Sequence, residues 1–321
     1  MLSRVASNIY WFGRHVERAE NTARLINVNA NLLLDLPRRI EFGWAPLIAI
    51  SGGEQDFRVW YDRMDEASVI RFLLADERNP CSIVSALAQA RENLRTTRDI
   101  LPREAWTEIN DLFLFAREQG EKAVALRSRL DYLERVIRSA QQLSGMLNST
   151  MSHDDAYRFL RLGYNLERAD MSTRIIDIRS ASLLPQQHDE LAPFQNIQWM
   201  SVLRSLSGYQ MYRRHVRLRV SGPLVLRFLL QDETFPRAVA YCLNRLETGL
   251  TRLPRGQDGL AITAQLRQQL QQADVQGLAE SGLSEFLDEF QLGLIRLHEQ
   301  IEQTYFLGGA GTAAEPSAGG Q

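Results

Sequence analysis

Residues 11–27, WFGRHVERAENTARLIN, decide the fold because their pattern returns at residues 160–177, LRLGYNLERADMSTRIID. The matched positions, 150 residues apart, are Gly13, Glu17, Arg18, Ala19, Glu20 and Arg24 with Gly163, Glu167, Arg168, Ala169, Asp170 and Arg174. Two copies of one charged helix predict an internally duplicated protein.

The charges of each copy form a narrow stripe. On a helix, Gly13, Glu17, Glu20 and Arg24 fall within about 60° of one another. Apolar residues flank this stripe on both sides: Ile9, Phe12, Val16, Ala19, Ala23 and Ile26 on one, Leu25, Val28 and Leu32 on the other. A helix with two apolar flanks packs on both of them, so we expect the charges to face protein or a cleft.

Two further blocks repeat in the same order. Residues 69–80, VIRFLLADERNP, match residues 225–236, VLRFLLQDETFP, and the Trp44 to Gly52 segment is answered by Trp199 to Gly208. The interval is too long for a solenoid of helical pairs, which repeats every 30–47 residues or so. We predict an all-α fold, a single compact bundle of about ten helices over residues 1–307. Its halves, residues 1–150 and 151–307, should be related by a pseudo-two-fold axis.

The composition limits the functional class. The 321 residues carry a net charge of −2, and 45% of them are hydrophobic. This balance gives no overall attraction to nucleic acid or to an anionic membrane. No signal peptide or apolar run of about 18 residues is found, so we expect a soluble cytoplasmic protein. The low-complexity residues 308–321 should be disordered.

Common catalytic motifs are absent. The sequence has no Glu-x-x-His or His-Glu-x-x-His pair, no Gly-x-Ser-x-Gly elbow and no nucleotide-binding glycine loop. Cys81 and Cys242 are interpreted as reduced, packed thiols, and Lys122 is the only lysine. We therefore predict no metal and no cofactor.

The charged stripe admits two interpretations. In one, it is a paired ionic network in which each arginine fork holds a carboxylate from the other copy. In the other, it is a ligand site, because buried ion pairs often add little net stability. Catalytic candidates are then Glu17 and Glu167, as acceptors of a proton or an amine. Ligand-binding candidates are Arg18, Glu20, Arg24, Arg168, Asp170 and Arg174.

Second-rank candidates lie in the repeated Asp-Glu-x-x-Pro corners. These are Asp76 and Glu77 in the first copy, and Asp232 and Glu233 in the second. Their simplest role is in helix connections. In the first corner we expect Asn79 to cap a helix that opens at Pro80.

Several segments together resemble the bacterial alpha-E domain family: HVERAENTAR, LERADMSTR, RFLLADERNPCSI, ARENLRTTRDILPREAWTEIN and LHEQIEQTYF, which ends at Phe306. The resemblance implies an all-α protein encoded beside, or fused to, a circularly permuted ATP-grasp protein and often a transglutaminase-like protease. The resemblance also implies a role in a system that forms amide or peptide bonds. The family's Glu-Arg motif falls on Glu17-Arg18 and Glu167-Arg168.

The resemblance favours an accessory or substrate-recognition component of an ATP-grasp-dependent ligation system. The chain lacks the β-rich nucleotide fold and the lysines of the ATP-grasp enzyme itself. Two alternatives stay open: an enzyme that acts on the ligated product through the Glu/Arg site, or a helical scaffold whose charges are purely structural.

Overall fold

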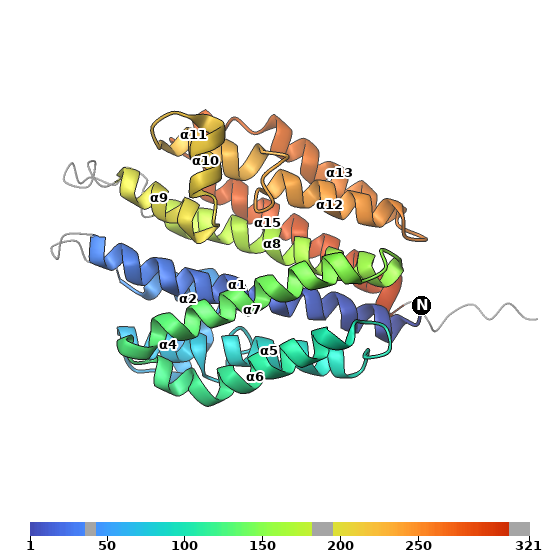
Figure 1. Ribbon diagram of the computed structural model, residues 1–321. Helices are drawn as coiled ribbons and strands as arrows, with labels where there is room; N and C mark the ends of the chain where they lie inside the picture. The colour runs from blue at the N-terminus through green and yellow to red at the C-terminus, as the bar shows by residue number, and fades with distance from the viewer. Residues whose placement is uncertain (36–42, 182–194, 308–321) are drawn as a thin grey trace, which may run out of the picture.

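The structure is a computed structural model that describes residues 1–35, 43–181 and 195–307. Regular structure in these ranges is entirely helical, which confirms the predicted all-α class. Figure 1 shows the long helices running roughly along one direction, in a bundle.

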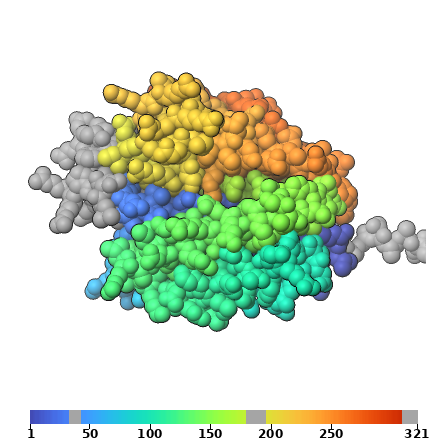
Figure 2. Space-filling view, viewed as in Figure 1, coloured from blue at the N-terminus to red at the C-terminus, as the bar shows by residue number. Residues whose placement is uncertain are grey.

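Two long helices form the centre, α1 (Ser3–Asp35) and α8 (Asp155–Ala181). They pack directly on each other; α1 also packs against α5 and α7, and α8 against α12 and α15. In Figures 1 and 2, α7 lies across the front of α1. The charged helices are therefore covered on both flanks, as their apolar pattern predicts.

The remaining elements of the first half surround α1. They are α2 (Ala45–Ser51), α3 (Glu54–Trp60), α4 (Glu66–Leu74), α5 (Ile83–Arg95), α6 (Arg103–Ala123) and α7 (Leu126–Thr150). Gly52 separates α2 from α3 with a left-handed φ of 73°, which glycine adopts without steric cost.

The second half surrounds α8. It contains α9 (Gln195–Ser205), α10 (Tyr209–Val216), α11 (Gly222–Leu226), the π-helical stretch η2 (Arg227–Gln231), α12 (Val239–Thr251), α13 (Gln257–Gln272), α14 (Val275–Leu278), α15 (Leu283–Ile301) and the π-helical stretch η3 (Glu302–Leu307). Phe290, Leu294 and Leu297 form the buried face of α15.

The predicted number of about ten helices is too low, because the described residues contain fifteen α-helices. The excess comes partly from short helices in the second half, such as the five residues of α11 and the four of α14. Helices this short do not complete enough turns to show a 3.6-residue periodicity. The predicted disordered tail, residues 308–321, lies outside the described residues.

The start of α5 also differs from the prediction. The helix begins at Ile83 instead of Pro80, and Ser82 caps it by accepting a hydrogen bond from the Ser85 amide at 3.1 Å. Asn79 stabilises the preceding turn instead. Its Nδ2 donates to the Phe72 carbonyl and its Oδ1 accepts from the Cys81 amide, both at 2.9 Å.

Candidate functional site

Glycine allows α1 and α8 to meet backbone to backbone. A methyl group on Gly13 would lie 2.6 Å from the carbonyl oxygen of Leu160, and one on Gly163 would lie 2.0 Å from that of Tyr10. Both distances are far below van der Waals contact, so a larger residue would force the helices apart. The two glycines therefore bring the two Glu-Arg segments within ion-pairing distance.

The ion pairs cross between the two helices. Arg18 donates to Glu167 from Nε at 2.6 Å and from Nη2 at 3.0 Å. Arg168 donates to Glu17 from Nε at 3.1 Å and from Nη2 at 2.6 Å. Each guanidinium thus holds the carboxylate of the other copy in a two-bond fork, the strongest geometry for this pair. This is the cross-pairing that the network interpretation expects.

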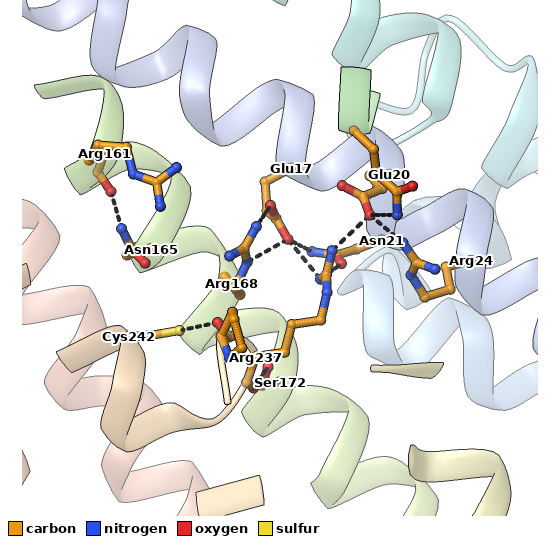
Figure 3. A network of polar contacts seen from close by, with 12 residues as sticks. Glu17, Glu20, Asn21, Arg24, Arg161, Asn165, Arg168, Ser172, Arg237 and Cys242 are labelled. Carbon is orange, nitrogen blue, oxygen red and sulfur yellow. Dashed lines mark hydrogen bonds and ion pairs between the residues drawn. The ribbon is translucent and has the colours of Figure 1, made fainter. Parts of the chain in front are cut away.

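Each glutamate has a second arginine, but from a different place. Arg14 of α1 donates to Glu167 at 2.7 Å. Glu17 instead accepts at 2.8 Å from Nη1 of Arg237, which lies in the turn before α12 (Figure 3). The repeated blocks place Arg237 where the first copy has Cys81.

Glu20 and Asp170, at corresponding positions, are paired differently. Glu20 accepts from Arg24, from Nη2 of Arg237 at 2.8 Å and from Gln141 of α7 at 3.2 Å. Asp170 accepts at 3.0 Å from Nε of Arg174, which contacts both carboxylate oxygens. The structure therefore gathers all eight first-rank candidates along the contact between α1 and α8.

The two glutamates of the crossed pairs, Glu17 and Glu167, are buried and ionised. Glu17 is 0% exposed and Glu167 is 1% exposed. Burial alone would raise the pKa of Glu17, but Arg168 and Arg237 outweigh it and lower that pKa to about 2. The pKa of Glu167 is lowered even though burial opposes the shift, because Arg18 and Arg14 lie against it. Asp170 differs, since burial raises its pKa.

Guanidinium groups outnumber carboxylates in the network. Six arginines contact four acids: Arg14, Arg18, Arg24, Arg168, Arg174 and Arg237 against Glu17, Glu20, Glu167 and Asp170. With every acid ionised, two positive charges remain in excess. The most exposed of these side chains are Arg174, at 30%, and Arg18, at 17%, so the excess charge reaches solvent there.

A hollow of about 490 Å³ opens beside Arg18. Its wall comes from α1, the turn before α5, α5 itself and α6, and its polar lining includes His15, Arg18, Glu77, Arg78, Gln89 and Arg117. Small side chains of α5, Ser85 and Ala88, complete the lining. This hollow is large enough for an amino-acid or dipeptide group.

The arginines of the hollow have hydrogen-bonding capacity to spare. Arg18 uses Nε and Nη2 for Glu167, and Nη1 has no hydrogen-bonded partner in the described part of the chain. Arg78 is held by Asp76 at 2.7 Å and lies over the ring of Trp60, 4.8 Å from its centroid. Neither Arg117 nor the Glu77 carboxylate has an ion-pair partner within residues 1–35, 43–181 and 195–307.

His15 makes this hollow less basic than its residue types suggest. Burial, with the nearby Arg18 charge, lowers the pKa of His15 to about 3, so the imidazole is neutral near pH 7. Its Nδ1 is buried, with no hydrogen-bond partner in the described residues. The neutral ring stacks on Trp11 at 5.4 Å.

The second-rank candidates separate into two roles. Asp76 accepts from Tyr61 and Arg78, and Asp232 accepts at 2.8 Å from the amides of Thr234 and Phe235, so both aspartates stabilise turns. The neighbouring glutamates line hollows instead. Glu77 lines the one beside Arg18, and Glu233 lines a smaller one of about 180 Å³ with Arg267.

Other reactive groups give no second site. Burial raises the pKa of the Cys81 thiol, and it raises that of Cys242 to about 12. The described residues contain no group of three or more histidine, cysteine or acidic side chains placed to hold a metal ion. Within the same ranges, no helix has both the length and the apolar character needed to cross a membrane.

The comparisons with known proteins agree with this architecture. The Alpha-E family model, described as a predicted alpha-helical domain with a conserved ER motif, matches residues 1–306. The chain therefore belongs to the Alpha-E family.

Similar proteins are found in mycobacteria. An uncharacterised protein of Mycobacterium bovis and one of Mycobacterium tuberculosis are each 27% identical to the chain over 273 residues. The match covers 78% of this chain but only 30% of each relative, so the chain spans about a third of their length. No solved structure matches.

Proposed function

We propose that this chain is a cytoplasmic accessory or substrate-recognition component of a bacterial ATP-grasp-dependent amide or peptide ligation system. The Alpha-E family resemblance supports this role, since it implies a circularly permuted ATP-grasp partner and often a transglutaminase-like protease. The mycobacterial relatives are much longer than the matched region. That length is consistent with a helical domain that works as one part of a larger assembly.

The observation that carries the recognition role is the hollow beside Arg18. An incoming carboxylate would accept hydrogen bonds from the unpaired Nη1 of Arg18 and from Arg117, which line the same hollow. Glu77, also in the lining, would accept an amine. Because the hollow offers cationic donors for a carboxylate and an anionic acceptor for an amine, it should select a zwitterionic amino acid or peptide end over a neutral one.

This proposal moves the ligand away from most of the charged stripe. The three glutamates of the stripe are paired with arginines: Glu17, Glu20 and Glu167. Arginines Arg24 and Arg168 pair with these glutamates, and Arg174 pairs with Asp170. Their proposed role is to hold α1 against α8 and to orient Arg18. A general base works best with a pKa near the operating pH, so arginine pairing, which lowers the pKa of Glu17 to about 2, argues against its use as a base.

The two halves are proposed to be related by a pseudo-two-fold axis. Three observations support this relation. Gly13 and Gly163 each contact the backbone of the other helix, and the Arg18–Glu167 and Arg168–Glu17 pairs cross between the copies. Glu77 and Glu233, at corresponding positions, each line a hollow. The second hollow is smaller, so the proposed substrate site belongs to the first half.

Calorimetry tests the recognition role. The ligands are glutamate, alanyl-glutamate and their amidated forms. Each is titrated into the wild-type chain and into the variants Arg117→Gln and Glu77→Gln, which change exposed side chains. The proposal expects binding of the free carboxylate forms, weakened several-fold in both variants, and wild-type behaviour for Arg138→Gln on α7. Binding of amidated and free forms with equal affinity would contradict it.

The partner is tested separately. The chain is co-expressed with the ATP-grasp protein of its own genome, and the pair is analysed by size-exclusion chromatography. A complex supports the accessory role. Turnover of a ligated peptide by the isolated chain would instead favour an enzyme acting on the product.

A further inference from the structure

A row of alternating arginine and aromatic side chains runs along α5, the turn that follows it and α6. Arg117 and Arg91 lie over the ring of Phe113, at 5.3 and 5.4 Å from its centroid. Arg91 and Arg98 lie over the ring of Trp106, at 5.3 and 3.6 Å. The order along the row is therefore Arg117, Phe113, Arg91, Trp106, Arg98.

The three arginines of this row keep their charge unpaired. No carboxylate of the described residues forms an ion pair with Arg91, Arg98 or Arg117, and the one hydrogen bond of Arg91 goes to the Asn110 side chain at 2.8 Å. Their neighbour Arg95, by contrast, is paired with Glu92 at 2.6 Å. A guanidinium that rests on an aromatic face directs its N–H groups outward, where they can receive a carboxylate.

The row begins at the hollow beside Arg18, because Arg117 and Phe113 belong to both. Neighbouring arginines of the row share one ring between them, so their guanidinium carbons lie no more than about 11 Å apart at Phe113 and about 9 Å apart at Trp106. Two to three residues of an extended peptide span such a distance. A ligand that fills the hollow can therefore continue along the row as an extended chain.

We propose that this row binds an extended peptide with acidic side chains spaced a few residues apart or closer, whose end occupies the hollow beside Arg18. This inference rests on the proposed function of the hollow and adds the class of substrate: an acidic, extended polypeptide. Single-stranded nucleic acid fits the row less well. Its bases need free aromatic faces for stacking, and arginines already lie over Trp106 and Phe113.

Fluorescence anisotropy with labelled penta-glutamate tests the proposal on the full chain. Arg98→Gln and the double variant Arg91→Gln with Arg98→Gln remove charge from the row beyond the hollow. Partly exposed ion pairs are weak, so we expect affinity to fall about threefold to fivefold for each arginine removed. Arg95→Gln, between the two positions in the chain and paired with Glu92, is the matched control and should bind like wild type. Circular dichroism verifies that each variant is folded.

Three results would overturn the acidic-peptide site: penta-glutamine binding as tightly as penta-glutamate, unchanged affinity in the double variant, or oligothymidylate of equal charge binding as tightly. The two proposals fail in distinguishable ways. If alanyl-glutamate binds the hollow but penta-glutamate gains nothing from Arg91 and Arg98, the row is refuted and the hollow stands. If penta-glutamate depends on Arg98 while alanyl-glutamate does not bind, the row stands and the hollow's role is refuted.

Discussion

Arg237 places Nη1 2.8 Å from Oε1 of Glu17, although 220 residues separate them in the chain. The same guanidinium reaches Glu20 from Nη2, and the Ser172 hydroxyl donates to the Arg237 carbonyl at 3.0 Å (Figure 3). Arg237 thus ties the turn before α12 to both central helices.

Replacement of Arg237 by methionine should therefore destabilise the fold. Removing one member of a buried charge network leaves its partners poorly compensated, at a cost on the order of 3 kcal/mol. Arg237→Lys keeps the charge but cannot reach Glu17 and Glu20 in the same way, so it should lie between methionine and wild type. Urea unfolding measures the free energy of unfolding of both variants.

The control is Arg138→Gln, at an exposed pair on α7, which should change the free energy of unfolding by less than about 1 kcal/mol. A loss for Arg237→Met no larger than for this control would refute the role.

The contact between α1 and α8 should not tolerate alanine at its glycines. In Gly163→Ala the new methyl group meets the Tyr10 carbonyl oxygen at 2.0 Å, so the helices must separate and strain the crossed ion pairs. Overpacking of this kind costs about 1–3 kcal/mol.

Gly145→Ala on α7 is the control, because nothing lies within 4 Å of its added methyl group. That control should be stabilised by up to about 1 kcal/mol, since alanine favours a helix over glycine. Thermal melts that rank the two variants in the opposite order would show that the close approach is unimportant.

The double variant Glu17→Gln with Glu167→Gln separates structure from recognition. Both carboxylates lie away from solvent and each holds two arginines. Without them the arginines repel one another in a buried setting, so we expect a loss of several kcal/mol in the free energy of unfolding. The chemical-denaturation midpoint measures this loss, with Glu134→Gln as an exposed control. A double variant that keeps wild-type stability but loses binding of free glutamate would instead place the ligand on these carboxylates.

The buried charged stripe was predictable because its signal is local. Glu17, Glu20 and Arg24 lie within two turns of one helix, and their apolar flanks show that the helix is covered on both sides. The repeat then predicted that a second helix carries the same stripe. Crossed pairing between the copies was one of two interpretations, and geometry was needed to choose between them.

Arg237 and the hollow could not be predicted in the same way. Arg237 joins the network only because the turn before α12 is folded back onto α1, and a sequence pattern does not encode that approach. The single available signal was that Arg237 stands where the first repeated block has Cys81. The hollow draws its lining from four separate segments. Arg18 and Glu77 were each candidates from the sequence, but nothing in the sequence placed them together.

Stability should fall in two steps as the pH decreases. Burial lowers the pKa of His15 to about 3 and that of His298 to about 4. Between these values and pH 6.5, both histidines are protonated in the unfolded chain but neutral in the folded chain. Folding therefore weakens as the pH falls below 6.5. The lowered pKa of Glu17, about 2 against a usual 4.5, acts in the same direction over a lower range, because its stabilising charge is lost as the pH drops through that interval. Asp170 opposes this trend, since burial raises its pKa and favours its protonated form in the folded chain.

Urea midpoints measured from pH 3 to pH 8 test the assignment. In His15→Gln the decline between pH 6.5 and pH 4 should be shallower than in wild type, while the decline below pH 4.5 is retained. Glu17→Gln should show the reverse: a lower midpoint throughout, with a shallower slope below pH 4.5. His153→Gln is the control, because His153 is exposed, where its ring donates to the Asn148 carbonyl and stacks on Tyr157. A wild-type midpoint that stays constant from pH 7 to pH 4 would mean that His15 and His298 are free to take up protons in the folded state.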